Sequence, residues 1–199
     1  MAGTLKVGGV TLATHSDATG LVSMDNNIVV PSLENATFPS GSILQTHVAT
    51  FGASAQATSA RYYYANDIAG TSATGTPMIS VTSRQENTRF TVYLNALIAT
   101  GSHSTSAENN IYTYLRYSLN SDMSSATNVI LAAEYQDMRA QGDLPQQTMV
   151  AHTGGCVLDM TNSVGVNFYF ALYHTVSGWS AGLYGSLVPA FLTVNEVQK

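Results

Sequence analysis

Charged side chains are scarce in this sequence. Only 10% of the 199 residues are Asp, Glu, Lys or Arg, whereas about 25% is usual in soluble proteins. The net charge is −5, and the two lysines are Lys6 and Lys199. Proteins that bind nucleic acid need clustered basic residues to neutralise phosphates. Because the arginines are scattered singly, we expect no nucleic-acid partner.

Cysteine is nearly absent. Cys156 is the only one, which excludes an intrachain disulfide and a zinc site built from several cysteines. We interpret Cys156 as a small buried hydrophobic residue. His152 lies four residues before it, but a metal site needs three or four ligands and no nearby pair completes this one. We therefore expect no metal and no cofactor. His47 and His174 fall in expected strands, and the sequence leaves open whether they meet across a sheet.

Long apolar runs are missing as well. No run approaches the roughly 20 residues that span a bilayer, so we expect no membrane partner. The N-terminus has no charged segment followed by an apolar one, and we expect no cleaved secretion signal. Uncharged Ser, Thr, Asn, Gln and Gly residues take the place of charged ones, and 45% of the residues are hydrophobic. A surface of this kind suits close contact with protein, so we expect much of it to be covered in an assembly.

The chain divides at the turn signal FPSG, which begins at Phe38. Before it, TLKVGGVTLAT predicts two short extended pieces around Gly8-Gly9, and NNIVVPSL predicts a third. After it, seven or eight β-branched and apolar stretches are separated by loops rich in Gly, Ser, Asn and Asp. This pattern is typical of an antiparallel β-sandwich or barrel. We therefore expect an N-terminal arm, residues 1–38, and a β-sandwich domain, residues 39–199.

Residues 124–141 have two interpretations. The segment SSATNVILAAEYQDMRAQG spaces Leu131, Tyr135 and Met138 as on one face of a helix, with a serine before it and Gly142 after it. The shorter stretch NVILAAEYQ also fits a buried strand. Periodicity cannot separate the two for a short apolar run, and we favour the strand while the helix stays open.

The motif GWSAG, Gly178 to Gly182, matches the nucleophile elbow of serine hydrolases. That elbow requires a strand, a turn and a helix, with the catalytic histidine later in the chain. No histidine follows Ser180, and Gly185 and Pro189 make a helix there unfavourable. We interpret the motif as a loop between strands and expect that the protein is not an enzyme.

Tyrosine is the aromatic residue that stands out. Three lie in a row at Tyr62, Tyr63 and Tyr64, and others recur in the expected strands. Tyrosine provides a large contact area with a polar end. Strand tyrosines usually pack on a sheet; as an alternative, Tyr62, Tyr63 and Tyr64 contact a glycan or another protein.

The order of these features resembles virion surface proteins of tailed bacteriophages. In that family a short arm with TLKV and LAT precedes a segment of the type ATFP-G-x-(I/V)-LQ, which leads into a β-sandwich. Here the matching stretches are residues 2–20 and 35–46 and, more loosely, residues 88–98 and 187–197. Such sandwiches occur at the tips of tail fibres and in small head-decoration proteins. The family offers no catalytic residue to transfer.

The resemblance implies a β-sandwich of jelly-roll type, usually a homotrimer, attached to the virion by its N-terminal arm. A tail-fibre tip normally follows a long shaft, whereas residues 1–38 are short. We therefore expect a capsid decoration or cement protein, assembled in the host cytoplasm and bound to the major capsid protein or another virion protein. The alternative is a receptor-binding tip or small fibre protein of the tail that binds host surface glycan.

The arm, residues 1–38, has too little apolar surface to offset an ordering cost of roughly 1–2 kcal/mol per residue. We expect it to be ordered only against a partner, on the capsid shell or a neighbouring subunit. Short extended pieces can add as strands to an exposed sheet edge, with alternate side chains filling pockets. The expected particle anchors are Leu5, Val7, Val10 and Leu12.

Overall fold

The computed structural model describes residues 3–7, 10–15, 22–24, 39–51, 61–65, 71–100, 108–137, 149–177, 181–183 and 189–199. Their regular secondary structure is entirely β. The chain forms two compact units, Met1–Thr37 and Phe38–Lys199, a division one residue away from the boundary expected at the FPSG turn. In the described part of the chain, no helix is long and apolar enough to cross a membrane.

The first unit contains a small antiparallel sheet. Its middle strand is β2 (Val10–His15), which pairs with β1 (Gly3–Val7) on one side and β3 (Val22–Met24) on the other. The two extended pieces expected around Gly8-Gly9 therefore pair with each other. The third piece, expected in NNIVVPSL, lies outside the described residues.

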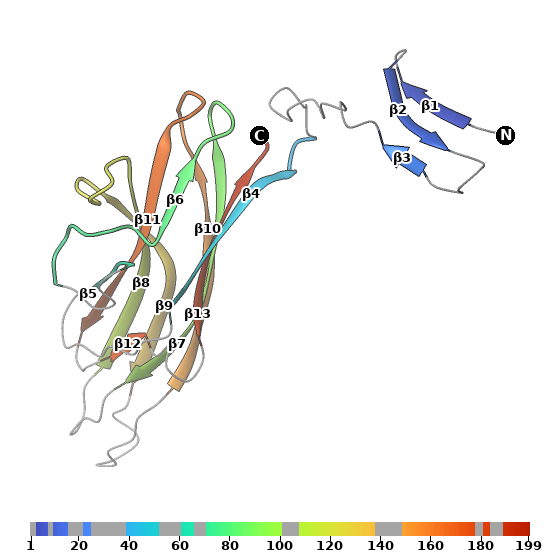
Figure 1. Cartoon of the computed structure of the whole chain (residues 1–199). Coiled ribbons are helices and arrows are strands. Elements are labelled where there is room, and N and C mark those ends of the chain that lie inside the picture. The colour runs from blue at the N-terminus through green and yellow to red at the C-terminus, as the bar shows by residue number, and fades with distance from the viewer. Residues whose placement is uncertain are drawn as a thin grey trace. The chain divides into compact units, whose positions relative to one another are not determined.

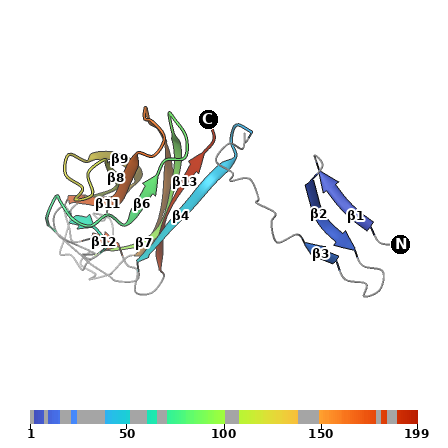
Figure 2. The same cartoon turned by 45° about the horizontal axis from the view of Figure 1, so that its top comes forward.

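The second unit is a sandwich of two antiparallel sheets (Figures 1 and 2). Sheet I has the order β10-β7-β13-β4, and the short strand β12 also pairs with β7. The bounds of its strands are β4 Ile43–Phe51, β7 Arg89–Thr100, β10 Met149–Asp159, β12 Ala181–Leu183 and β13 Ala190–Val197.

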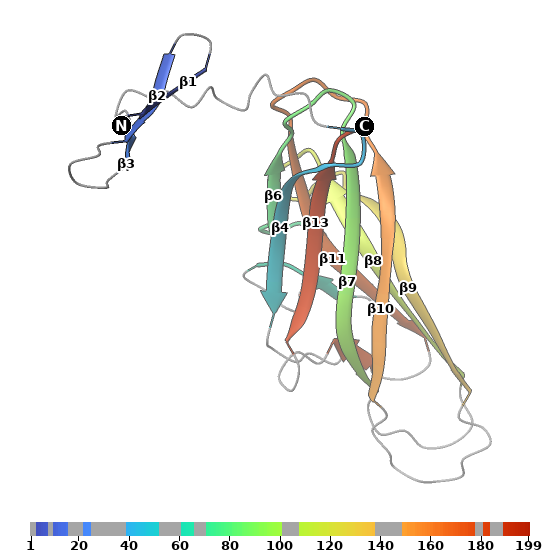
Figure 3. The ribbon, with the colours of Figure 1, turned by 90° about the vertical axis from the view of Figure 1, so that its right-hand side faces the viewer.

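Sheet II has the order β5-β11-β8-β9, and the short strand β6 also pairs with β11. The bounds of its strands are β5 Arg61–Tyr63, β6 Ile79–Thr82, β8 Glu108–Ser118, β9 Thr127–Asp137 and β11 Asn167–Ser177. Figure 3 shows sheet I in front, with β8, β9 and β11 of sheet II behind it.

The chain passes repeatedly from one sheet to the other. It runs from β4 in sheet I to β5 and β6 in sheet II, returns for β7, and crosses again for β8 and β9. The strands β10, β11 and β13 then alternate between sheets I, II and I. The expected antiparallel β-sandwich is confirmed, and this order is compatible with a jelly roll.

The ambiguous segment 124–141 forms a strand over its described part, since β9 covers Thr127–Asp137. The favoured interpretation is therefore confirmed and the helix is wrong. In this second unit the described residues include ten strands, β4 to β13, where the sequence predicted seven or eight. The short strand β12 was missed because three residues are too few to show a two-residue period.

The core lies between the sheets and follows from strand alternation. In β7, Phe90, Val92 and Leu94 are buried, whereas the residues between them face away from sheet II. The Phe90 ring meets the rings of Phe168 and Phe170 edge-on, with centroids 5.1 and 5.3 Å apart. These aromatic contacts join the central strand of sheet I to β11 of sheet II.

Gly154 allows the two sheets to approach closely where β10 packs beside β9. A Cβ atom added to Gly154 would lie 1.9 Å from the carbonyl oxygen of Leu131 in β9, a distance at which two atoms overlap. The sequence HTGGC therefore supplies a residue without a side chain where the backbones nearly touch.

Glu196 of β13 is fully buried, and its carboxylate accepts hydrogen bonds from several donors. Its side chain accepts hydrogen bonds from the Gln45 side chain, from the Arg84 backbone N–H at 2.9 Å and from the Thr88 hydroxyl at 3.5 Å. Arg84 and Thr88 lie in the loop between β6 and β7. The carboxylate thus ties this loop to β13 and β4, and its charge is stabilised by hydrogen bonds.

Candidate interaction surfaces

The three consecutive tyrosines do not share one environment. Strand alternation points Tyr63 inward, where it is 1% exposed and lies near Phe51 and His174. Tyr64 is 3% exposed, and a Cβ atom added to Gly75 would overlap its ring. The structure therefore corrects the expectation for Tyr63 and Tyr64 as open contact residues, because both rings are covered by the chain itself.

Tyr62 belongs to a row of half-buried tyrosines on the outer side of sheet II. Its ring stacks on Tyr173 with centroids 4.7 Å apart and on Tyr64 at 6.1 Å. Tyr173 in turn lies 5.5 Å from Tyr114, which lies 6.3 Å from Tyr112. Since sugars stack on open aromatic faces, rings that cover one another offer them little surface.

Arg116 lies under one end of this tyrosine row and is 7% exposed. Its guanidinium carbon is 4.9 Å from the centre of the Tyr62 ring, a cation–π distance. Its N–H groups donate to the carbonyl of Ala73 at 2.7 Å and to Asn128 Oδ1 at 3.2 Å. Burial raises the pKa of Tyr64, and the nearby Arg116 charge opposes that shift. Arg116 thus holds the segment around Ala73 and the side chain of Asn128 against β8 of sheet II.

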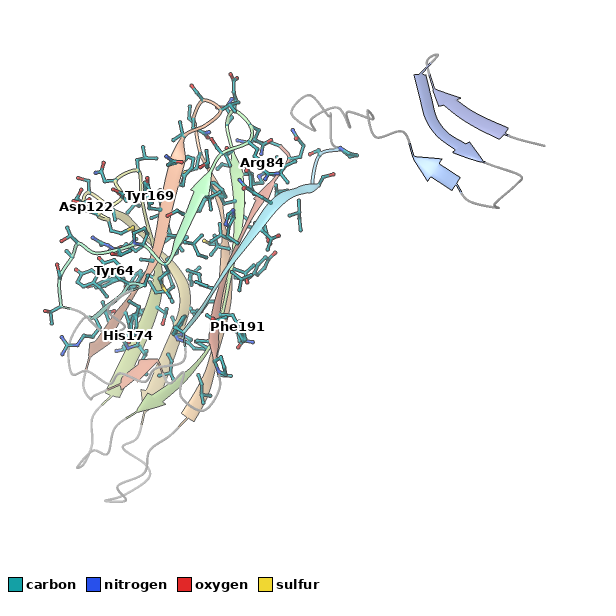
Figure 4. The ribbon with its side chains drawn as sticks, viewed as in Figure 1. Tyr64, Arg84, Asp122, Tyr169, His174 and Phe191 are labelled. Carbon is teal, nitrogen blue, oxygen red and sulfur yellow. The ribbon has the colours of Figure 1, made fainter. Side chains whose placement is uncertain are left out.

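The outer side of sheet I carries exposed hydrophobic side chains on all four main strands. Val48, Tyr93 and Val157 are 55%, 56% and 60% exposed, and Phe191 is 39% exposed. Figure 4 shows Phe191 and Tyr64 on opposite sides of the sandwich. Large exposed hydrophobic residues on neighbouring strands are a feature of interaction surfaces.

Three cross-strand rows make up this surface, which we call the uncharged face. Each row takes one residue from β10, β7, β13 and β4 in that order. The rows are Val157, Thr91, Asn195 and Thr46; Gly155, Tyr93, Thr193 and Val48; and Thr153, Asn95, Phe191 and Thr50. None of these twelve residues is charged.

The polar side chains of the first row bond to one another. The Thr46 hydroxyl donates to Asn195 Oδ1 at 2.9 Å, and Asn195 Nδ2 donates to the Thr91 hydroxyl at 3.4 Å. Asn195 is 8% exposed. Because these groups already have partners, a second protein can cover them without leaving them unpaired.

Charges border the uncharged face at one end. Arg89 donates to both carboxylate oxygens of Asp159, at 2.9 and 3.1 Å, and Lys199 Nζ lies 3.3 Å from the same carboxylate. The hydrogen bonds from Arg89 hold the pKa of Asp159 below its usual value. This cluster marks the rim of the face rather than its centre.

Two histidines meet inside the sandwich. His152 of β10 and His174 of β11 both lie beside the Thr113 hydroxyl, at 3.1 and 3.4 Å. His47, which the sequence left as a possible neighbour of His174, lies in β4 and contacts the Gln45 side chain at 3.1 Å. Burial lowers the pKa of His152 to about 4.

Cys156 is a free, half-buried thiol whose pKa is raised by burial, as expected for a packing residue. Among the described residues no group of three or more His, Cys, Asp or Glu side chains could hold a metal ion.

Ser180 and the side chains of the expected anchors lie outside the described residues. The backbone register places Val7 opposite Val10 and Leu5 opposite Ala13, with Leu12 at the irregularity between β1 and β2.

The sequence analysis missed the uncharged face. Alternation in RFTVYLN places Tyr93 on the side opposite Phe90, Val92 and Leu94. For this one strand, the sequence therefore predicts that Tyr93 faces away from the core. The neighbours of Tyr93 come from strands far away in the chain, including Thr193 and Gly155. A single sequence does not show which residues of these distant strands lie side by side.

No family model matches the chain, and no curated protein matches it in sequence. Among solved structures the chain is similar to the infectious bursal disease virus VP2 subviral particle, with 15% identity and a TM-score of 0.33 over 79% of this chain and 39% of that one. The infectious bursal disease virus Gx strain structure gives 16% identity and a TM-score of 0.34 over 78% and 37%. The chain thus spans under half the length of those proteins, and at these TM-scores the likeness carries no argument.

Proposed function

We propose that the chain is a structural protein of a bacteriophage virion, which decorates and cements the capsid surface through its N-terminal unit. The observation that carries the proposal is the division into two compact units, of which Phe38–Lys199 forms a β-sandwich and Met1–Thr37 contains a small sheet. A sandwich with its own core does not need that sheet to fold, so the small sheet is available for attachment. The sequence resemblance of residues 2–20 and 35–46 supports the same role.

The small sheet has edges that can accept a strand from another protein. In the described part of the first unit, β1 and β3 each pair with β2 alone. The outer edge of such a strand has backbone donors and acceptors to which an extended segment can add. The proposed partner is the major capsid protein or another virion protein, with Leu5, Val7, Val10 and Leu12 as the anchors.

The proposal includes a homotrimer without catalytic activity. A chain with 10% charged residues suits extensive protein contacts, because the cores of interfaces are depleted in charge. Closed cyclic symmetry is the common way to complete such an assembly. The absence of a catalytic role rests on the sequence, where no histidine follows Ser180.

A second candidate is a receptor-binding tip or small fibre protein of the tail. The tyrosine row of sheet II, which includes Tyr62, Tyr114 and Tyr173, favours this role because aromatic side chains recur at binding surfaces. The contacts of these rings with one another argue for a packing role instead. We therefore place the decoration role first.

Heating particles with and without the protein separates the two roles. If the protein cements the capsid, particles that lack it release their DNA at a lower temperature, and adding purified protein restores the release temperature. If it is a tail tip, the release temperature is unchanged and attachment to host cells is lost instead. That second result would overturn the proposed function.

A further inference from the structure

We propose that His152, Thr113 and His174 form a hydrogen-bonded relay that joins the two sheets and takes up a single proton in acid, on His152. The relay consists of three buried side chains, from β10, β8 and β11. It does not depend on attachment to a virion.

The hydroxyl of Thr113 is the centre of the relay. It lies 3.1 Å from Nδ1 of His152 and 3.4 Å from Nδ1 of His174, and all three side chains are buried. A hydroxyl has one hydrogen to donate and lone pairs that accept. Thr113 can therefore donate to one of the two nitrogens, and it accepts a hydrogen from the other.

This arrangement places the two rings in opposite tautomers at neutral pH. A neutral imidazole carries a hydrogen on only one of its nitrogens. The ring that donates to Thr113 carries its hydrogen on Nδ1, whereas the ring that accepts from Thr113 carries it on Nε2. Equal tautomers would leave either the hydroxyl hydrogen or one Nδ1 atom without its partner in the relay, which is costly inside a core.

The relay can hold one added proton but not two. With one proton, the cationic ring donates from Nδ1 to Thr113, and Thr113 donates to the neutral ring. With two protons, both Nδ1 atoms carry a hydrogen and the hydroxyl hydrogen loses its acceptor. Two buried cations would then lie on either side of one hydroxyl, and both burial and like charge disfavour that state.

The neighbouring strands place the added proton on His152. Arg61 of β5 is directly opposite His174 in the strand register, and like charges at opposite positions are destabilising. The position opposite His152 is Ala96 of β7, which has no charge. Burial lowers the pKa of His152 to about 4, so this ring takes up its proton only in acid.

The other titratable groups near the pair do not repel a cation. The Tyr63 ring of β5 meets His174 edge-on, and a tyrosine is neutral in acid. Cys156 lies further along β10 and has a thiol whose pKa is raised by burial. The backbone register of β9 places Glu134 opposite Ile111, and a carboxylate attracts a cation.

Nitrogen NMR of the full, isotope-labelled chain at pH 7 tests the relay, because the chemical shifts of the two ring nitrogens show which one carries the hydrogen. Thr113→Val removes the hydroxyl at similar volume, whereas Thr113→Ser keeps it. His47, which contacts the Gln45 side chain, is the internal control. Near-ultraviolet circular dichroism checks that each protein is folded.

We expect one Nδ1–H ring and one Nε2–H ring in the wild type and in Thr113→Ser, and loss of this opposite pair in Thr113→Val. The tautomers of His47 stay the same in all three proteins. As the pH is lowered toward the pKa of His152, the His152 ring becomes cationic while His174 stays neutral in the folded chain.

Three results would overturn the proposal. The first is a wild type in which both rings have the same tautomer, and this result is decisive even if Thr113→Val does not fold. The second is a folded Thr113→Val protein that keeps the opposite pair. The third is a folded wild type in which His174 is charged before His152, or in which both rings are cationic.

Discussion

The hydroxyl of Thr113 in sheet II lies 3.1 Å from Nδ1 of His152 in sheet I. A polar contact therefore crosses the core of the sandwich. His174 lies on the other side of the same hydroxyl at 3.4 Å, and the Tyr63 ring meets His174 edge-on at 6.2 Å. Arg61 of β5 is opposite His174 in the strand register. We therefore expect this cluster to make the stability of the sandwich sensitive to acid.

Stability is expected to fall between pH 6.5 and pH 4. The pKa of His152 is about 4 in the folded chain against an ordinary value of 6.5, so the unfolded chain takes up the proton first as pH falls. The stabilising effect is full above pH 6.5 and decreases by about 3 kcal/mol as the pH approaches 4. Urea unfolding at a series of pH values measures it.

Replacing His152 removes the titrating group. His152→Leu is expected to lose about 1 kcal/mol at pH 7 with the Thr113 contact and to show a flatter dependence of stability on pH. His47→Leu, which changes a histidine outside the cluster, keeps the wild-type dependence. An equally steep loss of stability in His152→Leu would contradict the assignment.

Strand alternation predicted much of this core and little of its polar detail. The alternation in RFTVYLN fits a sandwich strand with one buried side, and Phe90, Val92 and Leu94 are buried in the structure. The sequence paired His152 only with Cys156 and did not place it beside His174, because His174 comes from a strand of the other sheet. Such contacts depend on which distant strands pair with each other. The periodicity within one strand does not reveal its partner strands. The uncharged face was missed for the same reason.

Glu196→Gln is expected to destabilise the sandwich by about 1–3 kcal/mol, because the amide nitrogen replaces an acceptor that buried donors require. The donors are the Arg84 backbone, the Thr88 hydroxyl and the Gln45 side chain. Urea unfolding at pH 7 provides the measurement. Glu86→Gln is the control, since Glu86 is exposed, and its stability should stay within about 0.5 kcal/mol of wild type. Equal effects in the two variants would argue against the role of Glu196.

Gly154→Ala tests the close approach of β9 and β10. The added Cβ would overlap the Leu131 carbonyl oxygen, so the strands must separate, at a cost of about 3 kcal/mol or more. Ser80→Ala, at an exposed position of β6, should change stability by no more than about 0.5 kcal/mol. A Gly154→Ala protein with the wild-type unfolding midpoint would show that the strands are not in contact there.

Ser180→Ala is expected to leave folding and particle binding unchanged, because we interpret Ser180 as a loop residue, although Ala181 and Gly182 of the same motif belong to β12. Thermal unfolding and the amount of protein bound per particle measure the two properties. Hydrolysis of an ester substrate by the wild type, lost in Ser180→Ala, would instead identify Ser180 as a nucleophile.

The central claim is attachment to the virion through residues 1–38, and binding to particles that lack this protein tests it most directly. The comparison is between the full chain and a chain that begins at Pro39, counted as copies bound per particle, with circular dichroism to show that both are folded. The account predicts that the full chain decorates the particles and that the shortened chain stays in solution. Equal binding of the two chains would contradict it.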